Sequence, residues 1–326
     1  MPKIRYKVVR FSEERQSIVD QAIDLVATYS QQGYQLTLRQ LYYQFIARDL
    51  LPESWADKET GSTNNERSYK KLGDVIGDAR LAGLIDWTAI EDRTRNVDGN
   101  THWESPADIV RACANQFQLD KWVGQKHRVE VWVEKDALEG VVGKAAKAMD
   151  VQFFSCRGYA SMTSLWDAGQ RLKAYAAGGQ IPVIIHLGDH DPSGIDMSRD
   201  IEDRVSLFMD QHCDKLKFER LALNRSQVDE YEPPPNPAKV TDSRYKDYAS
   251  KFGDECWELD ALEPSVLDNL IQERILTYRQ DTKFDRIKKE EKAHRGNLTL
   301  AADHWNNGLM TALKDLSEEY DPDKEE

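Results

Sequence analysis

The feature that most constrains the fold is a regular alternation of apolar strands and amphipathic helices that begins near residue 127. Strands that are apolar along their whole length are typical of parallel sheets in which helices cover both faces. The alternation therefore predicts an α/β domain with a parallel β-sheet sandwiched by helices. The expected strands are RVEVWVE, VQFFSC, PVIIHLG and KFERLAL, at residues 128–134, 151–156, 182–188 and 217–223.

The first part of the chain shows helical periodicity in place of this alternation. Helices are expected at residues 12–32, 38–51 and 67–82, the first two capped by Ser12 and Thr37. The segments LIDWTAIED and RTRNVDGNTHW follow and are interpreted as the strands and wing of a winged helix. This order of elements is typical of a helical DNA-binding module.

Three regions are expected from these patterns. Residues 1–120 form a winged-helix DNA-binding domain, and residues 121–315 form the α/β domain with a C-terminal extension. Residues 316–326 are an acidic tail, SEEYDPDKEE in its last ten positions, whose composition predicts disorder. Two domains agree with a length of 326 residues.

The charge of the chain bears on its partners. The formal net charge of −13 taken alone argues against a nucleic-acid-binding protein, because such proteins carry a basic footprint. The charge is uneven, however, since residues 1–100 hold 14 Lys and Arg against 15 Asp and Glu, which leaves 30 against 42 for the remainder. An acidic protein can meet DNA through a local basic face, so the total charge does not exclude DNA.

Neither a signal sequence nor a membrane span is expected. The first ten residues, MPKIRYKVVR, have no apolar core, and the chain has no run of 18 apolar residues. Its four cysteines are far apart and form no C-x-x-C pair, which argues against a zinc site and against a disulfide framework. These features predict a protein of the reducing cytoplasm.

Three carboxylates stand at the ends of expected strands. Glu134 ends the first strand, and Asp189 and Asp191 follow the third strand in the segment GDHDPSG. Ligands of an open parallel sheet bind at the carboxyl ends of its strands, and Mg²⁺ prefers oxygen ligands. The sequence therefore predicts that these three carboxylates hold Mg²⁺. The alternative is that the two aspartates cap the helix that follows.

Several residues near these strand ends have a functional and a plain interpretation. Lys135 and Arg157 are candidates for DNA phosphate contacts, or else solvated side chains. His190 is expected to point away from the aspartates on either side of it, because side chains alternate along an extended segment. Glu258 and Asp260 could extend the metal site, but surface carboxylates are more often solvated.

The segment LRQLYYQFI, residues 38–46, contains a pair of tyrosines. At about 100° per residue, Tyr42 falls in the apolar stripe of the helix, whereas Tyr43 falls outside it. Arg39 lies one turn before Tyr43 on the same side. The pattern predicts that Tyr42 is a core residue and that Tyr43 is an exposed phenol beside a cation. Such a phenol can attack a phosphodiester while the arginine holds the phosphate oxygens.

Taken together, these motifs resemble the A subunit of type IIB topoisomerases (topoisomerase VI) and the related meiotic double-strand-break protein. TLRQLYY resembles the R-x-x-Y-Y segment of that family's winged-helix domain. VEKDAL and CRGYAS resemble the Glu motif and the following turn of its Toprim domain, and GDHDPSG resembles its D-x-D-P-x-G motif. The resemblance spans about residues 30–200.

The resemblance implies a mechanism and a set of partners. Tyr43 would attack double-stranded DNA and become linked to a 5′ end, and Arg39 and Glu134 would be the other catalytic residues. Arg39, Lys135 and Arg157 would contact DNA, and Glu134, Asp189 and Asp191 would hold Mg²⁺. The family's active site combines the tyrosine of one subunit with the metal site of another, which implies a homodimer.

The chain also departs from the family. Gln40 stands where the family often has an acidic residue, and GVVGK at residues 140–144 lacks the spacing of a P-loop. Strand passage would therefore need a separate ATPase subunit. The expected protein is a reduced, free-standing relative of bacterial, phage or plasmid origin. Two alternatives are a Toprim nuclease that uses a metal-activated water and a DNA-binding protein without catalysis.

Overall fold

The computed structural model of the chain describes residues 3–90 and 101–312. Residues 3–90 and 126–278 form one compact unit, and residues 101–125 and 279–312 form a second. This grouping differs from the expected boundary at residue 120, because the first unit contains both the N-terminal helices and the sheet. The expected acidic tail lies outside the described residues.

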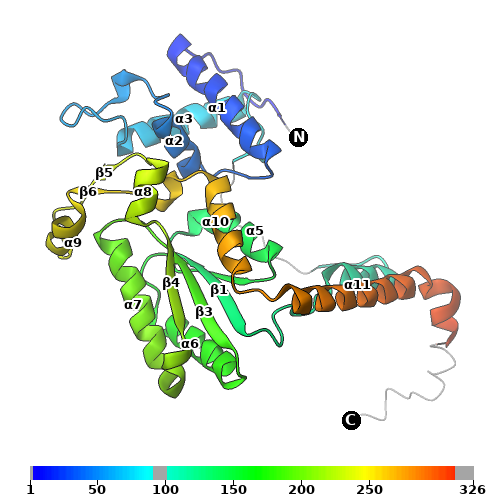
Figure 1. Cartoon of the computed structure of the whole chain (residues 1–326). Coiled ribbons are helices and arrows are strands. Elements are labelled where there is room, and N and C mark those ends of the chain that lie inside the picture. The colour runs from blue at the N-terminus through cyan, green and yellow to red at the C-terminus, as the bar shows by residue number, and fades with distance from the viewer. Residues whose placement is uncertain (1–2, 91–100, 313–326) are drawn as a thin grey trace. The chain divides into compact units, whose positions relative to one another are not determined.

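The first unit contains the parallel sheet that the sequence predicts (Figure 1). Its four strands are hydrogen-bonded in the order β2-β1-β3-β4, and all three pairings are parallel. The chain is thus a mixed α/β protein with a four-stranded parallel sheet. The strands are β1 (His127–Val133), β2 (Gln152–Ser155), β3 (Ile181–Leu187) and β4 (Lys217–Ala222).

Helices cover both faces of the sheet, as expected for strands that are buried along their length (Figure 1). After β2 the chain passes over β1 to reach β3, so right-handed crossovers place α5 on one face and α6 and α7 on the other. Trp132 and Ile184 of the sheet pack with Leu165 of α6 and Ile201 of α7 in one buried cluster. The helices are α5 (Glu139–Ala148), α6 (Met162–Ala177), α7 (Pro192–Met209) and α10 (Pro264–Leu276).

The direction of the chain through the sheet reverses between β1 and β3. These two strands are neighbours, and each leads into a crossover that runs toward a different edge of the sheet. Loops at such a switch point diverge at the carboxyl ends of the strands and leave a crevice between them. Glu134 follows β1 and Asp189 follows β3, so the predicted carboxylates flank this point.

In the first unit, three helices precede the sheet, close to their predicted positions: α1 (Glu13–Gln31), α2 (Leu38–Ala47) and α3 (Glu66–Leu81). Ser12 accepts a hydrogen bond from the backbone of Arg15, and Thr37 accepts one from that of Gln40, so both predicted caps are confirmed. Large apolar side chains of the three helices form one core, which includes Ile18, Leu25, Tyr29, Leu41, Phe45, Leu72 and Ile76.

The structure does not confirm the winged helix. Residues 84–90 form no strand, and their one described pairing is an isolated parallel bridge between Leu36 and Ile90. Residues 91–100, which hold much of the expected wing, lie outside the described residues, and residues 101–105 are not strand either. The helices α1 to α3 are therefore a helical region without a described wing.

Shorter elements complete the first unit. The segment after β4 is folded into small helices and a two-stranded antiparallel ladder, and it ends in a 3₁₀ turn before α10. These elements are α8 (Arg225–Tyr231), β5 (Asn236–Pro237), α9 (Tyr245–Phe252), β6 (Glu255–Cys256) and η4 (Leu259–Ala261). Further 3₁₀ turns are η1 (Glu53–Trp55), η2 (Asp136–Leu138) and η3 (Asp210–Lys215).

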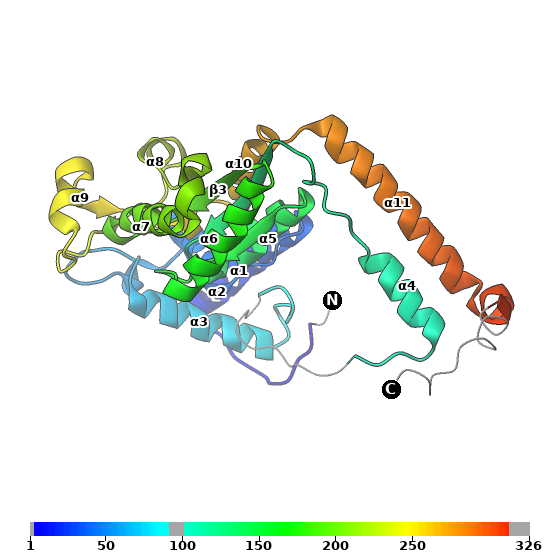
Figure 2. The same cartoon turned by 90° about the horizontal axis from the view of Figure 1, so that it is seen from below.

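The second unit is a pair of helices that lie side by side, α4 (Pro106–Gln116) and α11 (Asp281–Asp303) (Figure 2). A buried ion pair joins its two chain segments, with 2.7 Å between Lys121 Nζ and Glu291 Oε2. A π-helical turn, Trp305–Leu309, follows α11. Across residues 3–90 and 101–312, no helix combines the length and the apolar character needed to cross a membrane.

Candidate active site

The loop GDHDPSG joins β3 to α7 in a tight turn. Asp191 is the N-cap of α7, because its Oδ1 accepts a hydrogen bond of 2.6 Å from the backbone N–H of Gly194. A Cβ atom at Gly194 would lie 2.3 Å from the carbonyl oxygen of Asp189, and one at Gly188 would lie 2.8 Å from Glu134 Oε2. Both glycines are thus needed for the close approach of Glu134 to the loop.

Glu134 is buried beneath this loop. Its Oε2 accepts a hydrogen bond of 2.9 Å from the backbone N–H of Asp189. Burial raises the pKa of Glu134, and the nearby charge of Asp191 raises it further. Glu134 and Asp191 are thus two acids that act on each other at the carboxyl ends of neighbouring strands, as the sequence predicts.

Asp189 bonds to groups on two other segments of the chain. Its Oδ2 lies 2.9 Å from Lys135 Nζ, and its Oδ1 accepts a hydrogen bond of 2.8 Å from the backbone N–H of Leu259. Within the described parts of the chain, no three His, Cys, Asp or Glu side chains are placed so that they could hold a metal ion. The expected convergence of three carboxylates on one ion is therefore not present in this arrangement. Burial raises the pKa of Asp189 to about 8 even though Lys135 lowers it, and the charges of Glu134 and Asp260 add to the rise.

The donor set at the switch point fits a divalent cation in part. Glu134 and Asp191 offer hard carboxylate oxygens, and burial together with the charge of Asp191 raises the pKa of Glu134. Asp189 does not fit, because both its oxygens are engaged.

A compact charge cluster lies on the other side of the loop. Lys135 Nζ lies 2.8 Å from Glu258 Oε2 and 3.0 Å from Asp260 Oδ1. Arg39 Nη2 lies 2.6 Å from Glu258 Oε2, and Arg39 Nε lies 3.2 Å from Asp260 Oδ2. With Asp189, two cations and three carboxylates form one network, which we call the charge cluster.

The ionisation of the charge cluster follows from these contacts. Burial would lower the pKa of Lys135, but Asp260, Asp189 and Glu258 raise it well above the usual lysine value. Burial would raise the pKa of Glu258, but Lys135 and Arg39 lower it to about 2. Both partners are therefore charged at neutral pH, and the pairs are ion pairs.

The charge cluster corrects two expectations. Glu258 and Asp260 were expected to be solvated, but Asp260 is 1% exposed and both are bonded to cations. Lys135 was a candidate for contact with a DNA phosphate, but it is bound by three carboxylates. Arg157 is exposed, and its Nη2 lies 3.8 Å from Glu139 Oε1.

Tyr43 is buried, which corrects the expectation of an exposed phenol; the residue is 4% exposed. The outward side of α2 packs against η4, a segment more than 200 residues later, so a polar side of the helix is covered. The Arg39 guanidinium lies over the Tyr43 ring, with 5.9 Å between its carbon and the ring centroid, which confirms that the two side chains are neighbours. Tyr43 and Glu258 line the same cleft, and both contact Arg39.

Burial raises the pKa of the Tyr43 phenol, and the charges of Asp260 and Glu258 raise it further, while Arg39 lowers it. The phenol is therefore protonated at neutral pH. A nucleophile in this state needs an acceptor for its proton when it attacks.

Tyr42 is a core residue, as its place in the apolar stripe predicts. Its hydroxyl accepts a hydrogen bond of 2.9 Å from the backbone N–H of Asn65 and lies 3.1 Å from the carbonyl oxygen of Thr63. These bonds hold the loop before α3, where Asn65 is the N-cap. The two adjacent tyrosines thus have different surroundings, one with backbone groups and one with charges.

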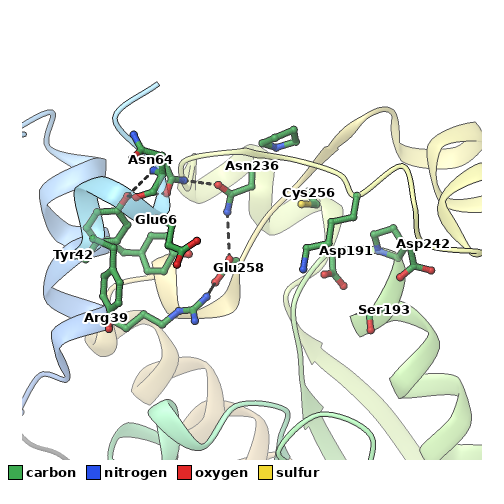
Figure 3. Close-up of a pocket in the computed structure, with 16 residues that line it drawn as sticks. Arg39, Tyr42, Asn64, Glu66, Asp191, Ser193, Asn236, Asp242, Cys256 and Glu258 are labelled. Atoms are coloured by element: carbon green, nitrogen blue, oxygen red, sulfur yellow. Dashed lines mark hydrogen bonds and ion pairs between the residues drawn. The ribbon is translucent and has the colours of Figure 1, made fainter. Parts of the chain in front are cut away.

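A cleft of about 660 Å³ connects the tyrosine pair with the end of β3 (Figure 3). Arg39 and Tyr42 lie at one end and Asp191 and Ser193 at the other, with Glu258 between them (Figure 3). The remaining residues that line it include Tyr43, Asn64, Asn65, Glu66, Tyr69, Asn236, Lys239, Asp242 and Cys256. The cleft brings together side chains from α2, the start of α7 and the segment around β5 and β6.

Arg220 of β4 organises the loop GDHDPSG, which we call the acidic loop; this role was not identified from the sequence. Its Nη2 donates to the carbonyl oxygens of Gly188 (3.0 Å) and Asp189 (2.5 Å), and its Nη1 donates to that of Gly194 (3.0 Å). One signal in the sequence could have identified it, because Arg220 is a charged residue in an expected strand of a sheet that helices cover on both faces. Such a residue must have partners, because burying an unpaired charge is costly.

His190 points away from the two aspartates, as predicted. It is buried, and its Nδ1 lies 2.8 Å from the hydroxyl oxygen of Tyr248. Its backbone forms a bridge with Trp257. His190 therefore anchors the β6 segment to the acidic loop.

No family model matches this chain, and no curated protein shows significant similarity to it.

Proposed function

We propose that this chain is a Mg²⁺-dependent DNA-cleaving protein of the topoisomerase VI A type, with Tyr43 as the nucleophile. The observation that carries the proposal is the cleft, which Tyr43 and Arg39 of α2 share with Asp191 at the end of β3. A tyrosine, an arginine and a carboxylate pair are the groups needed for a phosphotyrosyl intermediate. The parallel sheet with acids at its switch point supports the assignment of a Toprim-like domain.

In the proposed reaction, Arg39 would bind the phosphodiester that Tyr43 attacks. Its side chain is partly exposed, so it can leave Glu258 and Asp260 for a phosphate. A guanidinium forms strong paired hydrogen bonds with phosphate oxygens and stabilises the charge that develops on them. Arg157, which is exposed at the same edge of the sheet, would contact DNA further along.

Glu134 and Asp191 would hold Mg²⁺, which when bound would stabilise negative charge on the reacting phosphate. Glu134 is fixed for this task by the backbone N–H of Asp189, and Asp191 by the start of α7. Asp189 would keep Lys135 in place beside them.

The resemblance to topoisomerase VI A implies a homodimer in which the tyrosine of one chain serves the acids of another. In a single chain, Tyr43 and Asp191 also line one cleft, so a mixed-dimer experiment must decide between the two arrangements. Strand passage would require a separate ATPase subunit.

Trapping of a covalent protein–DNA adduct tests this proposal. The chain would be incubated with labelled duplex DNA and Mg²⁺, denatured, and examined for DNA that migrates with the protein. We expect an adduct with the unaltered chain and none with Tyr43→Phe. Tyr42→Phe is the matched control, and it should retain the adduct because its hydroxyl bonds to backbone groups.

One observation favours the alternative of a hydrolytic nuclease, namely the burial of the Tyr43 phenol. In that case a metal-activated water would cleave DNA, and Tyr43→Phe would cleave as fast as the unaltered chain without any adduct. An Asp191→Ala variant that cleaves DNA normally would contradict both forms of the proposal.

A further inference from the structure

We propose that Glu258 is the catalytic residue that accepts the proton of the Tyr43 phenol during strand cleavage. This inference rests on the function proposed above and assigns a residue that the motifs did not place in the reaction. It also gives a role to a carboxylate that lies beside the tyrosine and apart from Glu134 and Asp191.

Glu258 lies beside Tyr43 in the cleft that both side chains line. Both contact Arg39, whose guanidinium carbon lies 5.9 Å from the Tyr43 ring centroid and whose Nη2 lies 2.6 Å from Glu258 Oε2. Lys135 Nζ holds the same oxygen at 2.8 Å, and Asn236 Nδ2 lies 3.4 Å from Oε1. A general base must lie within reach of the proton that it takes, and Glu258 is the carboxylate that shares the cleft and the arginine with the phenol.

Asp260 is less suited to this role, although it belongs to the same cluster. Its Oδ1 faces Lys135 and its Oδ2 faces Arg39, and it influences Tyr43 through its charge. Glu258 lines the cleft beside Tyr43, where a phosphodiester would enter.

The charges facing Glu258 explain how its basicity would change during the reaction. Arg39 and Tyr43 face it from α2, Lys135 from the end of β1, and Asp260 from η4. In the resting chain the two cations make Glu258 a weak base. When a DNA phosphate draws Arg39 away, one of these cations is removed, so the same event that positions the phosphate increases the affinity of Glu258 for a proton.

Cleavage would exchange one bond to phosphorus for another. The Tyr43 oxygen forms a bond to phosphorus while the bond from phosphorus to the 3′ oxygen of the neighbouring nucleotide breaks. The phenol proton passes to Glu258, and the departing 3′ oxygen takes a proton from solvent water. The products are a 5′-phosphotyrosyl link, a free 3′ hydroxyl and a neutral Glu258, which returns its proton on religation.

The test compares Glu258→Gln with the unaltered chain in the rate of adduct formation. Glutamine keeps the size and a hydrogen-bond acceptor but takes no proton, so we expect the rate to fall by ~10²- to 10⁴-fold. Replacing Tyr43 by a fluorinated tyrosine, whose phenol is more acidic, should accelerate Glu258→Gln far more than it accelerates the unaltered chain. A structural role for Glu258 gives no reason for such a rescue.

A matched control lies in the same unit. Tyr29, Glu263 and Arg48 form a second tyrosine–glutamate–arginine group that does not line the cleft. Glu263→Gln should leave the rate of adduct formation unchanged. Glu258→Asp, which keeps the charge, serves as a second variant if Glu258→Gln does not fold, and it should respond to the fluorinated tyrosine less than the amide does.

Mixed dimers provide an independent readout. If Glu258 serves the tyrosine of its own chain, mixing Glu258→Gln with Asp191→Ala restores adduct formation, and mixing it with Tyr43→Phe does not. Three outcomes would overturn the role of Glu258 while leaving the proposed function intact. One is restoration by Tyr43→Phe but not by Asp191→Ala. The others are a normal rate for Glu258→Gln and failure of the fluorinated tyrosine to accelerate this variant. An unaltered chain that forms no adduct would overturn both.

Discussion

Lys135 Nζ lies 2.9 Å from Asp189 Oδ2, and this ion pair determines where the first aspartate of GDHDPSG points. Lys135 follows β1 and Asp189 follows β3, so the contact also joins two neighbouring strands at their carboxyl ends. Asp189 is thereby part of the charge cluster with Glu258 and Asp260, while its backbone N–H donates to Glu134.

Replacing Lys135 should strongly destabilise the protein. Lys135→Met would leave Asp189, Glu258 and Asp260 with less positive charge in a mostly buried position, and removing one partner of a buried pair costs about 3–5 kcal/mol. The free energy of unfolding in urea measures this effect. Lys70→Met, which breaks an exposed pair with Glu66, is the control and should change the value by less than about 0.5 kcal/mol. Similar values for the two variants would contradict the importance of the charge cluster.

Two glycines should respond to alanine in opposite directions. At Gly194 the new Cβ would lie 2.3 Å from the carbonyl oxygen of Asp189, so Gly194→Ala should destabilise by about 1–3 kcal/mol. Gly77 lies in α3, where an added Cβ would meet no atom of the described residues within 4 Å, so Gly77→Ala should stabilise by about 0.4–1 kcal/mol. Thermal unfolding of both variants checks the two signs. An unchanged unfolding temperature for Gly194→Ala would show that the acidic loop tolerates displacement.

A dimeric active site predicts complementation between two inactive variants. Tyr43→Phe retains Glu134 and Asp191, and Asp191→Ala retains the tyrosine. A mixed dimer therefore has one site with all its groups if each site is shared between chains. We expect adduct formation to return in an equimolar mixture, at up to about half the unaltered level in the mixed dimers. If neither mixing nor co-refolding restores the adduct, each chain uses its own tyrosine and acids.

The pH dependence of stability should include a contribution from His186, which is fully buried on β3 with Nδ1 3.0 Å from Ser198 Oγ. Burial, together with the charge of Arg220, lowers the pKa of His186 from 6.5 to about 3. The unfolded chain therefore binds a proton below pH 6.5 that the folded chain does not bind. This contribution to stability is complete above pH 6.5 and falls as the pH decreases toward 3.

His186→Gln removes this titration while keeping an acceptor or donor for Ser198. Between pH 6 and pH 4 the unaltered chain should lose about 1.4 kcal/mol more per pH unit than the variant. Urea unfolding at several pH values measures the difference in slope. Parallel curves for the two proteins would mean that His186 is protonated in the folded chain.

The elements that form the sheet could be predicted because their signals are local. The strand β3 is apolar along most of its length, and Ser12 and Thr37 are caps whose partners lie within three residues. The contact between Arg39 and Tyr43 also follows from their helical spacing of four residues. The pairing of residues 101–125 with α11 carries no such local signal, because it joins distant segments.

The candidate site was predicted in part. Glu134 and Asp191 lie at the switch point because they follow β1 and β3, which are neighbours in the sheet. The direction of Asp189 could not be predicted, since it depends on Lys135 and on the backbone of Leu259, 70 residues later. The burial of Tyr43 could not be predicted either, since it depends on the packing of α2 against η4, more than 200 residues later.

By itself, the sequence determined which segments become strands and helices and which side of each is apolar, since these properties depend on neighbours a few residues apart. The tertiary structure alone decided which polar sides are covered and which charges pair. Glu258 and Asp260 are ordinary surface acids until the fold places them against Arg39 and Lys135, more than 100 residues away in the chain. Periodicity cannot reveal such contacts, because an ion pair depends on distance in space and leaves no pattern along the chain.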